Sequence, residues 1–227
     1  MTPDRIIEMD VSQDAIDHLP YESAGVVYSE QLVERVLNDF TNRGDLVFDP
    51  FAGFGTTLMV ARRMGRPSIG IELLPERAAF IRARLESVVD PGSRPVASTS
   101  VIEHDSLDLA HVELPPIDFS LSSPPYMTQN DHPENPLDGY RSLGGDYERY
   151  LEDLARVYEQ VSQLLVPDGV MVINVATLVV DGHETPLAND LYDALSNVLT
   201  MDEVIEVRGA CTASWLGSDY LLVCATA

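Results

Sequence analysis

The sequence predicts an α/β fold with an open, mostly parallel sheet, and three observations support this fold class. First, the apolar run at 46–48 ends in an acid and a glycine-rich turn, behind which apolar residues recur at helical spacing. Second, another apolar run, at 68–72, is again followed by a helical segment. Third, a long helical segment separates the strand predicted at 117–121 from the one at 170–175. Strands that alternate with helices in this way are typical of parallel sheets.

The remaining elements follow in chain order. Residues 1–20 are acidic and loosely periodic, and we expect them to form an arm or a lid. Ser29 is expected to cap a helix whose apolar face carries Leu32, Val33, Val36, Leu37 and Phe40. Later elements are a strand at 101–105, a polar loop at 126–146, helices at 147–165 and 186–199, and closing strands at 203–209 and 220–225. The polar loop is either a cover over a substrate or a surface insertion.

The turn at 49–57, with the sequence Asp-Pro-Phe-Ala-Gly-Phe-Gly-Thr-Thr, lies at the carboxyl end of a predicted strand. Ligands of open α/β sheets gather at that edge, and glycines let backbone approach them closely. The turn lacks the lysine of a phosphate-binding loop and the three-glycine dinucleotide pattern. Asp49 suits a cationic amine, and Thr56 and Thr57 supply hydroxyl groups. Glu72 ends the next strand about 20 residues on, the spacing at which an acid meets ribose hydroxyls.

A second motif, Ser122-Ser123-Pro124-Pro125-Tyr126, follows the strand predicted at 117–121. Together with the first turn it resembles the S-adenosylmethionine-dependent amino-methyltransferases that modify exocyclic amines of nucleobases in DNA and RNA. The resemblance extends from about Pro20 to the C-terminus. It implies a Rossmann-like, seven-stranded class I methyltransferase sheet with helices on both faces and an antiparallel last strand.

The resemblance also implies roles for individual residues. S-adenosylmethionine is the expected cofactor, and no metal is expected. The turn is expected to hold its amino-acid end, Glu72 its ribose, Leu73 the face of its adenine and Asp105 the adenine amino group. The residues of the turn expected to bind are Asp49, Phe51, Ala52, Gly53, Gly55, Thr56 and Thr57.

The second motif is where we expect the reaction. An aromatic amine is a poor nucleophile because its lone pair is delocalised into the ring. The Ser123 hydroxyl and the Pro124 carbonyl can accept its two N–H groups and orient it. Pro125 stiffens the turn, and the ring of Tyr126 offers a stacking surface. In the family, serine at the position of Ser123 is commoner in enzymes that act on the cytosine amino group.

The substrate stays open between two kinds of molecule. The resemblance favours DNA or RNA, whereas a net charge of -23, with all 14 basic residues arginine, favours a free nucleoside or small heteroaromatic amine. A saline habitat, in which proteins are kept acidic for solubility, and a GC-rich genome, which replaces lysine by arginine, would explain the same composition. A non-catalytic accessory subunit that relies on a basic partner is the alternative from another class, and a homodimer also stays open.

Length and cysteine content bound the organisation of the chain. The 227 residues predict one catalytic domain at 21–227 after the N-terminal arm, without a separate target-recognition domain. Cys211 and Cys224 are expected in or near the core of a cytoplasmic protein, with no membrane segment. Trp215 lies between the two closing strands, where it either lines the substrate side or covers the sheet edge. The arginines of the helix after Glu72, namely Arg77, Arg82 and Arg84, are expected on a solvated face.

Overall fold

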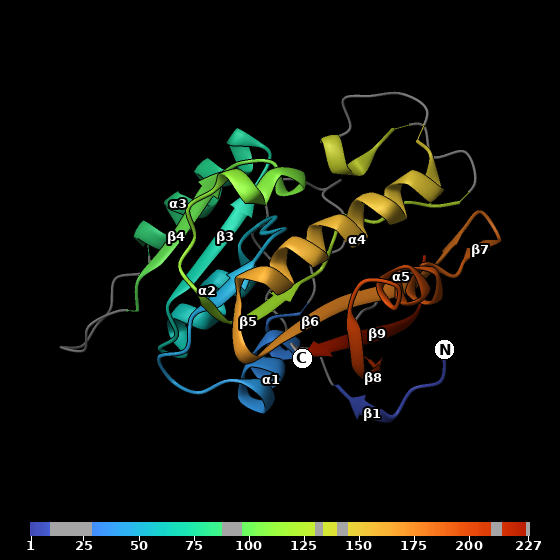
Figure 1. Ribbon diagram of the computed structural model, residues 1–227, viewed down its shortest axis with the longest axis horizontal. Coiled ribbons are helices and arrows are strands. Elements are labelled where there is room, and N and C mark those ends of the chain that lie inside the picture. The colour runs from blue at the N-terminus through green and yellow to red at the C-terminus, as the bar shows by residue number, and fades with distance from the viewer. Residues whose placement is uncertain (10–28, 88–96, 130–133, 140–144, 210–214, 226–227) are drawn as a thin grey trace.

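The computed structural model describes residues 1–9, 29–87, 97–129, 134–139, 145–209 and 215–225, and among these it contains a nine-stranded sheet with helices on both faces (Figure 1). The strands are β1 (Arg5–Glu8), β2 (Val47–Asp49), β3 (Ser68–Glu72), β4 (Thr99–Glu103), β5 (Ile117–Ser122), β6 (Leu165–Val180), β7 (His183–Thr185), β8 (Thr200–Arg208) and β9 (Leu216–Ala225). The helices are α1 (Glu30–Phe40), α2 (Thr56–Arg63), α3 (Pro75–Ser87), α4 (Tyr147–Leu164) and α5 (Leu187–Leu195), with the 3-10 helices η1 (Ser106–His111) and η2 (Pro136–Asp138).

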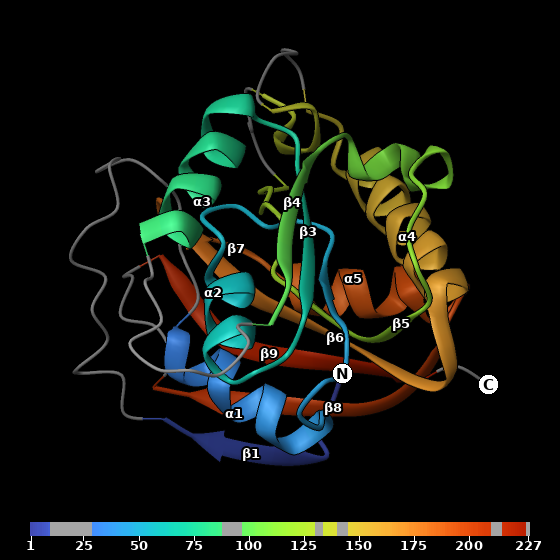
Figure 2. The ribbon, with the colours of Figure 1, turned by 90° about the vertical axis from the view of Figure 1, so that its left-hand side faces the viewer.

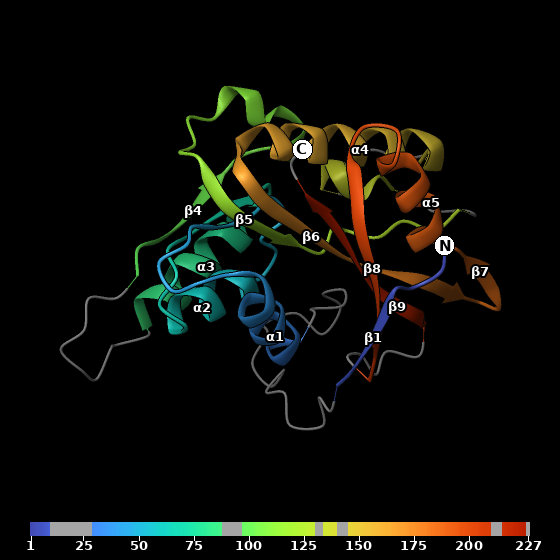
Figure 3. The same ribbon diagram turned by 60° about the horizontal axis from the view of Figure 1, so that its bottom comes forward.

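The strand order confirms the predicted fold class. It runs β1-β8-β9-β6-β5-β2-β3-β4, with β7 paired to β6. The pairs from β6 across to β4 are parallel, whereas β9 is antiparallel to both β6 and β8. The seven predicted strands are present, and their last one is antiparallel as expected. The short strands β1 and β7 are additional, and Figure 3 shows β1 beside β8 at one end of the sheet and β4 at the other.

Each face of the sheet is covered by its own set of helices (Figure 2). On one face, α4 and α5 pack through a buried cluster that includes Tyr150, Tyr158 and Leu191. On the other face, α1 and α2 pack through a cluster that includes Leu37 and Val60. Side chains of β6 alternate between the two clusters, as the pleat of a strand buried on both faces requires.

Several predicted boundaries agree with the structure, and some differ. Ser29 caps α1, because its hydroxyl accepts the Leu32 N–H at 3.2 Å. The expected N-terminal arm is in part a strand, since Arg5–Glu8 pairs in parallel with β8; residues 10–20 lie outside the described part of the chain. Strand β6 continues well past the predicted end at residue 175 and turns back into β7. Cys224 is buried as expected, whereas Cys211 lies outside the described residues.

Gly55 is the position in the first turn where only glycine fits. It precedes α2 with φ +80°, in the left-handed region that other residues rarely adopt. A Cβ atom there would also lie 3.0 Å from Ile81 Cγ1 on α3. This glycine therefore sets both the shape of the turn and the close approach of α3.

Candidate active site

Asp49, at the end of β2, stabilises the turn that follows through hydrogen bonds of its carboxylate. Its Oδ1 accepts the Phe51 N–H at 2.9 Å, and its Oδ2 accepts the Thr57 hydroxyl at 2.6 Å. Asp49 is 1% exposed and Thr57 is fully buried. The hydrogen bonds between these residues therefore hold the conformation of the turn.

Glu72 ties the end of β3 to the same turn. One carboxylate oxygen accepts the Gly53 N–H at 2.9 Å and the other accepts the Leu74 N–H at 2.8 Å. The side chain lies in a mostly buried position, and burial raises the pKa of this carboxyl above its ordinary value. The two backbone hydrogen bonds and the positive charge of Arg77 oppose that rise in the pKa.

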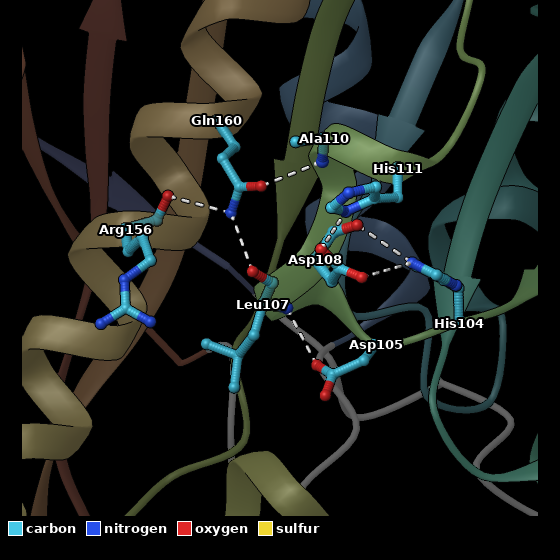
Figure 4. Close-up of polar contacts among 8 residues, drawn as sticks. All are labelled: His104, Asp105, Leu107, Asp108, Ala110, His111, Arg156 and Gln160. Carbon is cyan, nitrogen blue, oxygen red and sulfur yellow. Dashed lines mark hydrogen bonds and ion pairs between the residues drawn. The ribbon is translucent and has the colours of Figure 1, made fainter.

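Asp105 begins η1, which follows β4. Its Oδ1 accepts the Leu107 N–H at 2.9 Å, so this residue caps the helix. Figure 4 shows how Gln160 of α4 holds η1 from the side. The Gln160 amide accepts the Ala110 N–H at 3.0 Å and donates to the Leu107 carbonyl at 3.2 Å. A helix on one face of the sheet thus fixes the segment that carries Asp105.

Two histidines lie beside this segment, around Asp108 of η1 (Figure 4). His104 Nε2 lies 3.0 Å from the Asp108 carbonyl oxygen, and His111 Nδ1 contacts the Asp108 carboxylate. His104 thus contacts η1 and does not line the cavity. Among the described residues, no cluster of three or more His, Cys, Asp or Glu side chains could hold a metal ion.

The second motif is also held by α4. Tyr150 donates from its hydroxyl to the Pro125 carbonyl at 2.8 Å. About two turns further along the same helix, the Tyr158 hydroxyl lies 3.0 Å from Ser122 Oγ. Within the motif, Ser123 Oγ donates to Tyr126 Oη at 3.3 Å. The motif is therefore anchored at both ends by buried tyrosines, and the Ser123 hydroxyl is oriented by its neighbour.

A single cavity of about 210 Å³ joins the two motifs. The predicted residues that line it are Phe51, Ala52, Gly53, Thr56, Glu72, Leu73, Asp105, Ser123, Pro124, Pro125 and Tyr126. The predicted residues that do not line it are Asp49, Gly55 and Thr57, which are buried at the end of β2, in the turn and at the start of α2, respectively. The fold therefore brings the carboxyl ends of four strands, β2 to β5, to one site.

Sequence reasoning did not identify all of the lining. The further residues are Pro50, Phe54, Ile71, Leu74, Arg77, Ser106, Leu107, Pro136, Leu137 and Gly139. Leu107 comes two residues after Asp105, as Leu74 does after Glu72, and that parallel was a usable signal. Pro136 and Leu137 begin η2, whose N-cap Asn135 and first-turn proline are a recognisable helix start inside the polar loop.

One expectation about α3 is wrong. Arg82 is exposed as predicted, but Arg77 lines the cavity and stacks on the Phe54 ring at 5.1 Å from its centroid. Arg84 is half-buried and donates to the Phe54 carbonyl at 2.6 Å. The turn of the first motif projects Phe54 toward α3, so two arginines on that side pack against it.

Comparison with solved structures identifies the class to which the fold belongs. The fold matches solved methyltransferases that use S-adenosylmethionine. One is a SAM-dependent methyltransferase from Methanosarcina mazei, with a TM-score of 0.61 over 84% of this chain and 96% of that one, at 10% identity. Another is magnesium protoporphyrin IX methyltransferase from Synechocystis PCC 6803, solved with bound SAM, with a TM-score of 0.56 over 87% and 79% of the two chains, at 12% identity. The chain therefore has the fold of class I SAM-dependent methyltransferases.

Sequence similarity places part of the chain more closely. Residues 20–82 match the N6/N4 methyltransferase family model, described as DNA methylase. The type II methyltransferase M2.DpnII of Streptococcus pneumoniae is 47% identical over 58 residues, which are 26% of this chain and 22% of that protein. M.BamHI of Bacillus amyloliquefaciens is 49% identical over 59 residues, 26% of this chain and 14% of that protein. Over this region the chain is similar to the N6/N4 DNA methylases, and it spans less than a quarter of the length of either relative.

S-adenosylmethionine, the cofactor of this class, fits the residues present. Glu72 and Asp105 provide carboxylate acceptors at neighbouring strand ends, and each uses backbone N–H groups for part of its hydrogen-bonding capacity. Leu73 and Leu107 offer apolar surface beside them. The cofactor carries a net positive charge, which suits this acidic lining.

No described helix is long and apolar enough to cross a membrane.

Proposed function

We propose that the chain transfers a methyl group from S-adenosylmethionine to an exocyclic amine of a nucleobase. The observation that carries this proposal is that one cavity is lined both by the turn after β2 and by Ser123 to Tyr126. When bound, the cofactor supplies a methyl group on a positively charged sulfonium, which an amine can displace directly. The protein's task is then mainly to position the two reactants.

The cofactor end of the cavity divides among three strand ends. Phe51 to Gly53 and Thr56 are assigned to the amino-acid part, Glu72 to the ribose hydroxyls, and Asp105 to the adenine amino group, with Leu73 against the adenine ring. Asp49, Gly55 and Thr57 act through the shape of the turn, because the hydrogen bonds of Asp49 and the positive φ of Gly55 set its conformation. The charged form of Glu72 is the better acceptor for a hydroxyl, and the nearby Arg77 favours that form.

The acceptor amine is assigned to the second motif. The Ser123 hydroxyl hydrogen points to Tyr126 Oη, so the lone pairs of Ser123 Oγ are left to accept an amine N–H. The Pro124 carbonyl supplies the second acceptor. Tyr150 donates to the next carbonyl, that of Pro125, and so fixes the turn on which both acceptors lie.

Similarity to the DNA methylase family model over residues 20–82 supports DNA as the substrate, and serine at position 123 favours cytosine. A second candidate rests on a separate observation. The net charge of -23 opposes association with a polyanion and supports a free nucleoside or a small heteroaromatic amine instead.

Two experiments test the proposal. Isothermal titration should show binding of S-adenosylhomocysteine, and its absence would refute the assignment of the cavity. Methyl transfer should then be assayed side by side on duplex DNA, single-stranded DNA, tRNA and free nucleosides. Activity on a polynucleotide that weakens with added salt supports nucleic acid as the substrate. Activity restricted to free nucleosides, with little dependence on salt, supports the second candidate.

A further inference from the structure

Trp215 lies at the same edge of the sheet as both motifs. It directly precedes β9, and β9 is antiparallel to β6. The start of an antiparallel strand lies where its parallel neighbours end. Trp215 accordingly lines the cavity, so of the two positions that the sequence left open for this residue the structure supports the substrate side.

The strand order shows which end of the cavity Trp215 occupies. Going along the sheet from β4, the strands are β3, β2, β5, β6 and β9. Asp105 and Glu72 follow β4 and β3, the turn follows β2, and Ser123 follows β5. Trp215 comes after all of these, two strands beyond Ser123. It therefore lies at the opposite end of the cavity from the groups assigned to adenine and ribose.

The lining contributed beyond β5 is apolar and aromatic. Apart from Ser123, Gly139 and the two prolines of the motif, it consists of Tyr126, Pro136, Leu137 and Trp215. The charged side chains of the lining, Glu72, Arg77 and Asp105, all come from β3, α3 and the segment after β4. Such a surface suits a flat, uncharged ring better than a flexible charged chain.

The hairpin formed by β6 and β7 ties Trp215 to the loop that carries Tyr126. On one strand of the hairpin, the Val179 N–H donates to the Trp215 carbonyl at 2.8 Å. On the other strand, Thr185 Oγ1 accepts the Gln129 N–H at 3.1 Å, and Gln129 lies three residues after Tyr126. The β6–β7 hairpin thus contacts both Trp215 and the loop that carries Tyr126.

We propose that Trp215 forms part of the acceptor subsite and binds a planar heteroaromatic ring by stacking. The assignment deepens the proposed function and rests on it. Tyr126 and Trp215 supply aromatic surface, Pro136 and Leu137 supply apolar walls, and Ser123 takes the exocyclic amine of the same ring. The substrate is accordingly recognised by its ring, and a ring-free amine is excluded because it leaves this surface unfilled.

The chain contains a single tryptophan, so its fluorescence reports directly on this subsite. With the protein saturated by S-adenosylhomocysteine, titration with cytidine should quench the Trp215 emission to a plateau. Ribose 5-phosphate, which has no ring base, should leave the emission unchanged. Equal responses to both compounds, or none to cytidine, would contradict the assignment.

Two substitutions extend the test to turnover. Trp215→Leu should raise the KM for the base-containing substrate by about fivefold or more, because base stacking on an aromatic side chain is of that strength. Trp215→Phe, which keeps a ring, should fall between this variant and the unaltered protein. The S-adenosylhomocysteine Kd should stay within about twofold in both, and thermal unfolding should show that both are folded.

The outcomes separate the two proposals. Normal cofactor binding and turnover with an unchanged KM in Trp215→Leu would refute the role of Trp215 and leave the proposed function standing. Loss of cofactor binding in the unaltered protein would refute the proposed function itself. A parallel loss of cofactor affinity in both Trp215 variants would place this residue at the cofactor end of the cavity and overturn the assignment.

Discussion

The hydroxyl of Tyr150 offers a direct way to disturb the second motif without touching it. Tyr150 is 1% exposed and donates to the Pro125 carbonyl at 2.8 Å. Removing a buried hydrogen-bond donor and leaving its acceptor unsatisfied costs about 1–3 kcal/mol. For a protein of this size each kcal/mol lowers the Tm by about 2–4 °C. Tyr150→Phe should therefore lower the Tm by roughly 2–12 °C.

The same loss should appear in turnover. If the hydrogen bond holds the Pro124 and Ser123 acceptors in place, about 1.4 kcal/mol of lost positioning corresponds to a tenfold lower kcat. The S-adenosylhomocysteine Kd should change little, because the residues assigned to the cofactor precede this motif. Methyl-transfer assays quenched at fixed times measure kcat, and isothermal titration measures the S-adenosylhomocysteine Kd separately.

Tyr147→Phe is the matched control. Tyr147 belongs to the same helix, and its hydroxyl donates to Asp190 of α5 at 2.9 Å instead of to the motif. This variant should lose stability in the same way but keep its kcat. Equal losses of kcat in the two variants would refute the positioning argument, since general destabilisation would then explain both. An unchanged kcat in Tyr150→Phe would refute it as well.

Further predictions concern pH and the support of the cofactor site. Because burial raises the pKa of Glu72, S-adenosylhomocysteine affinity should fall as the pH is lowered from 7 through that raised pKa, where protonation removes a charged acceptor. Arg77→Gln should move this midpoint to higher pH, and an unmoved midpoint in titrations at several pH values would refute the coupling. Gln160→Leu should weaken S-adenosylhomocysteine binding about threefold to tenfold by releasing η1, with kcat at saturating cofactor nearly unchanged, whereas a fall in kcat alone would argue against this role. Burial raises the pKa of Asp219 to about 7, above its unfolded value, so the folded state loses stability as the pH rises from about 4 to 7. Asp219→Asn, which still accepts from Asn174, should raise the Tm at pH 8 and not at pH 4, and thermal unfolding at the two pH values checks this.

Much of the sheet could be predicted because its central strands are buried on both faces. Runs such as 46–48 and 170–175 are continuously apolar, and the glycines and acids that follow them mark the ligand edge. The four residues of β1 carry no comparable pattern, because this edge strand exposes Ile6 while burying Ile7. Its pairing with β8 joins residues that are 200 positions apart in the chain, as in the pair Arg5 and Ile205.

The β6–β7 hairpin was missed although its turn carried a local signal. Asp181 and Gly182 both adopt positive φ, which is the conformation that an Asp-Gly pair favours in a two-residue hairpin. The position of Trp215 at the cavity could not be deduced from local sequence, because it follows from the antiparallel pairing of β9. The use of the Asp49 carboxylate within the turn likewise could not be deduced from residue types alone, since the Phe51 N–H and the Thr57 hydroxyl bind it in the folded turn.

The position of the methyl group in the product tests the central claim most directly. The protein is incubated with S-adenosylmethionine and DNA or nucleosides, and mass spectrometry of the resulting nucleosides identifies the methylated atom. The proposed function predicts a methyl group on an exocyclic amine, lost in Ser123→Ala and retained in the matched variant Ser120→Ala. Ser120 belongs to β5, is fully buried, and its hydroxyl has no hydrogen-bond partner among the described residues. A methyl group on a ring carbon, or full activity in Ser123→Ala, would contradict the account.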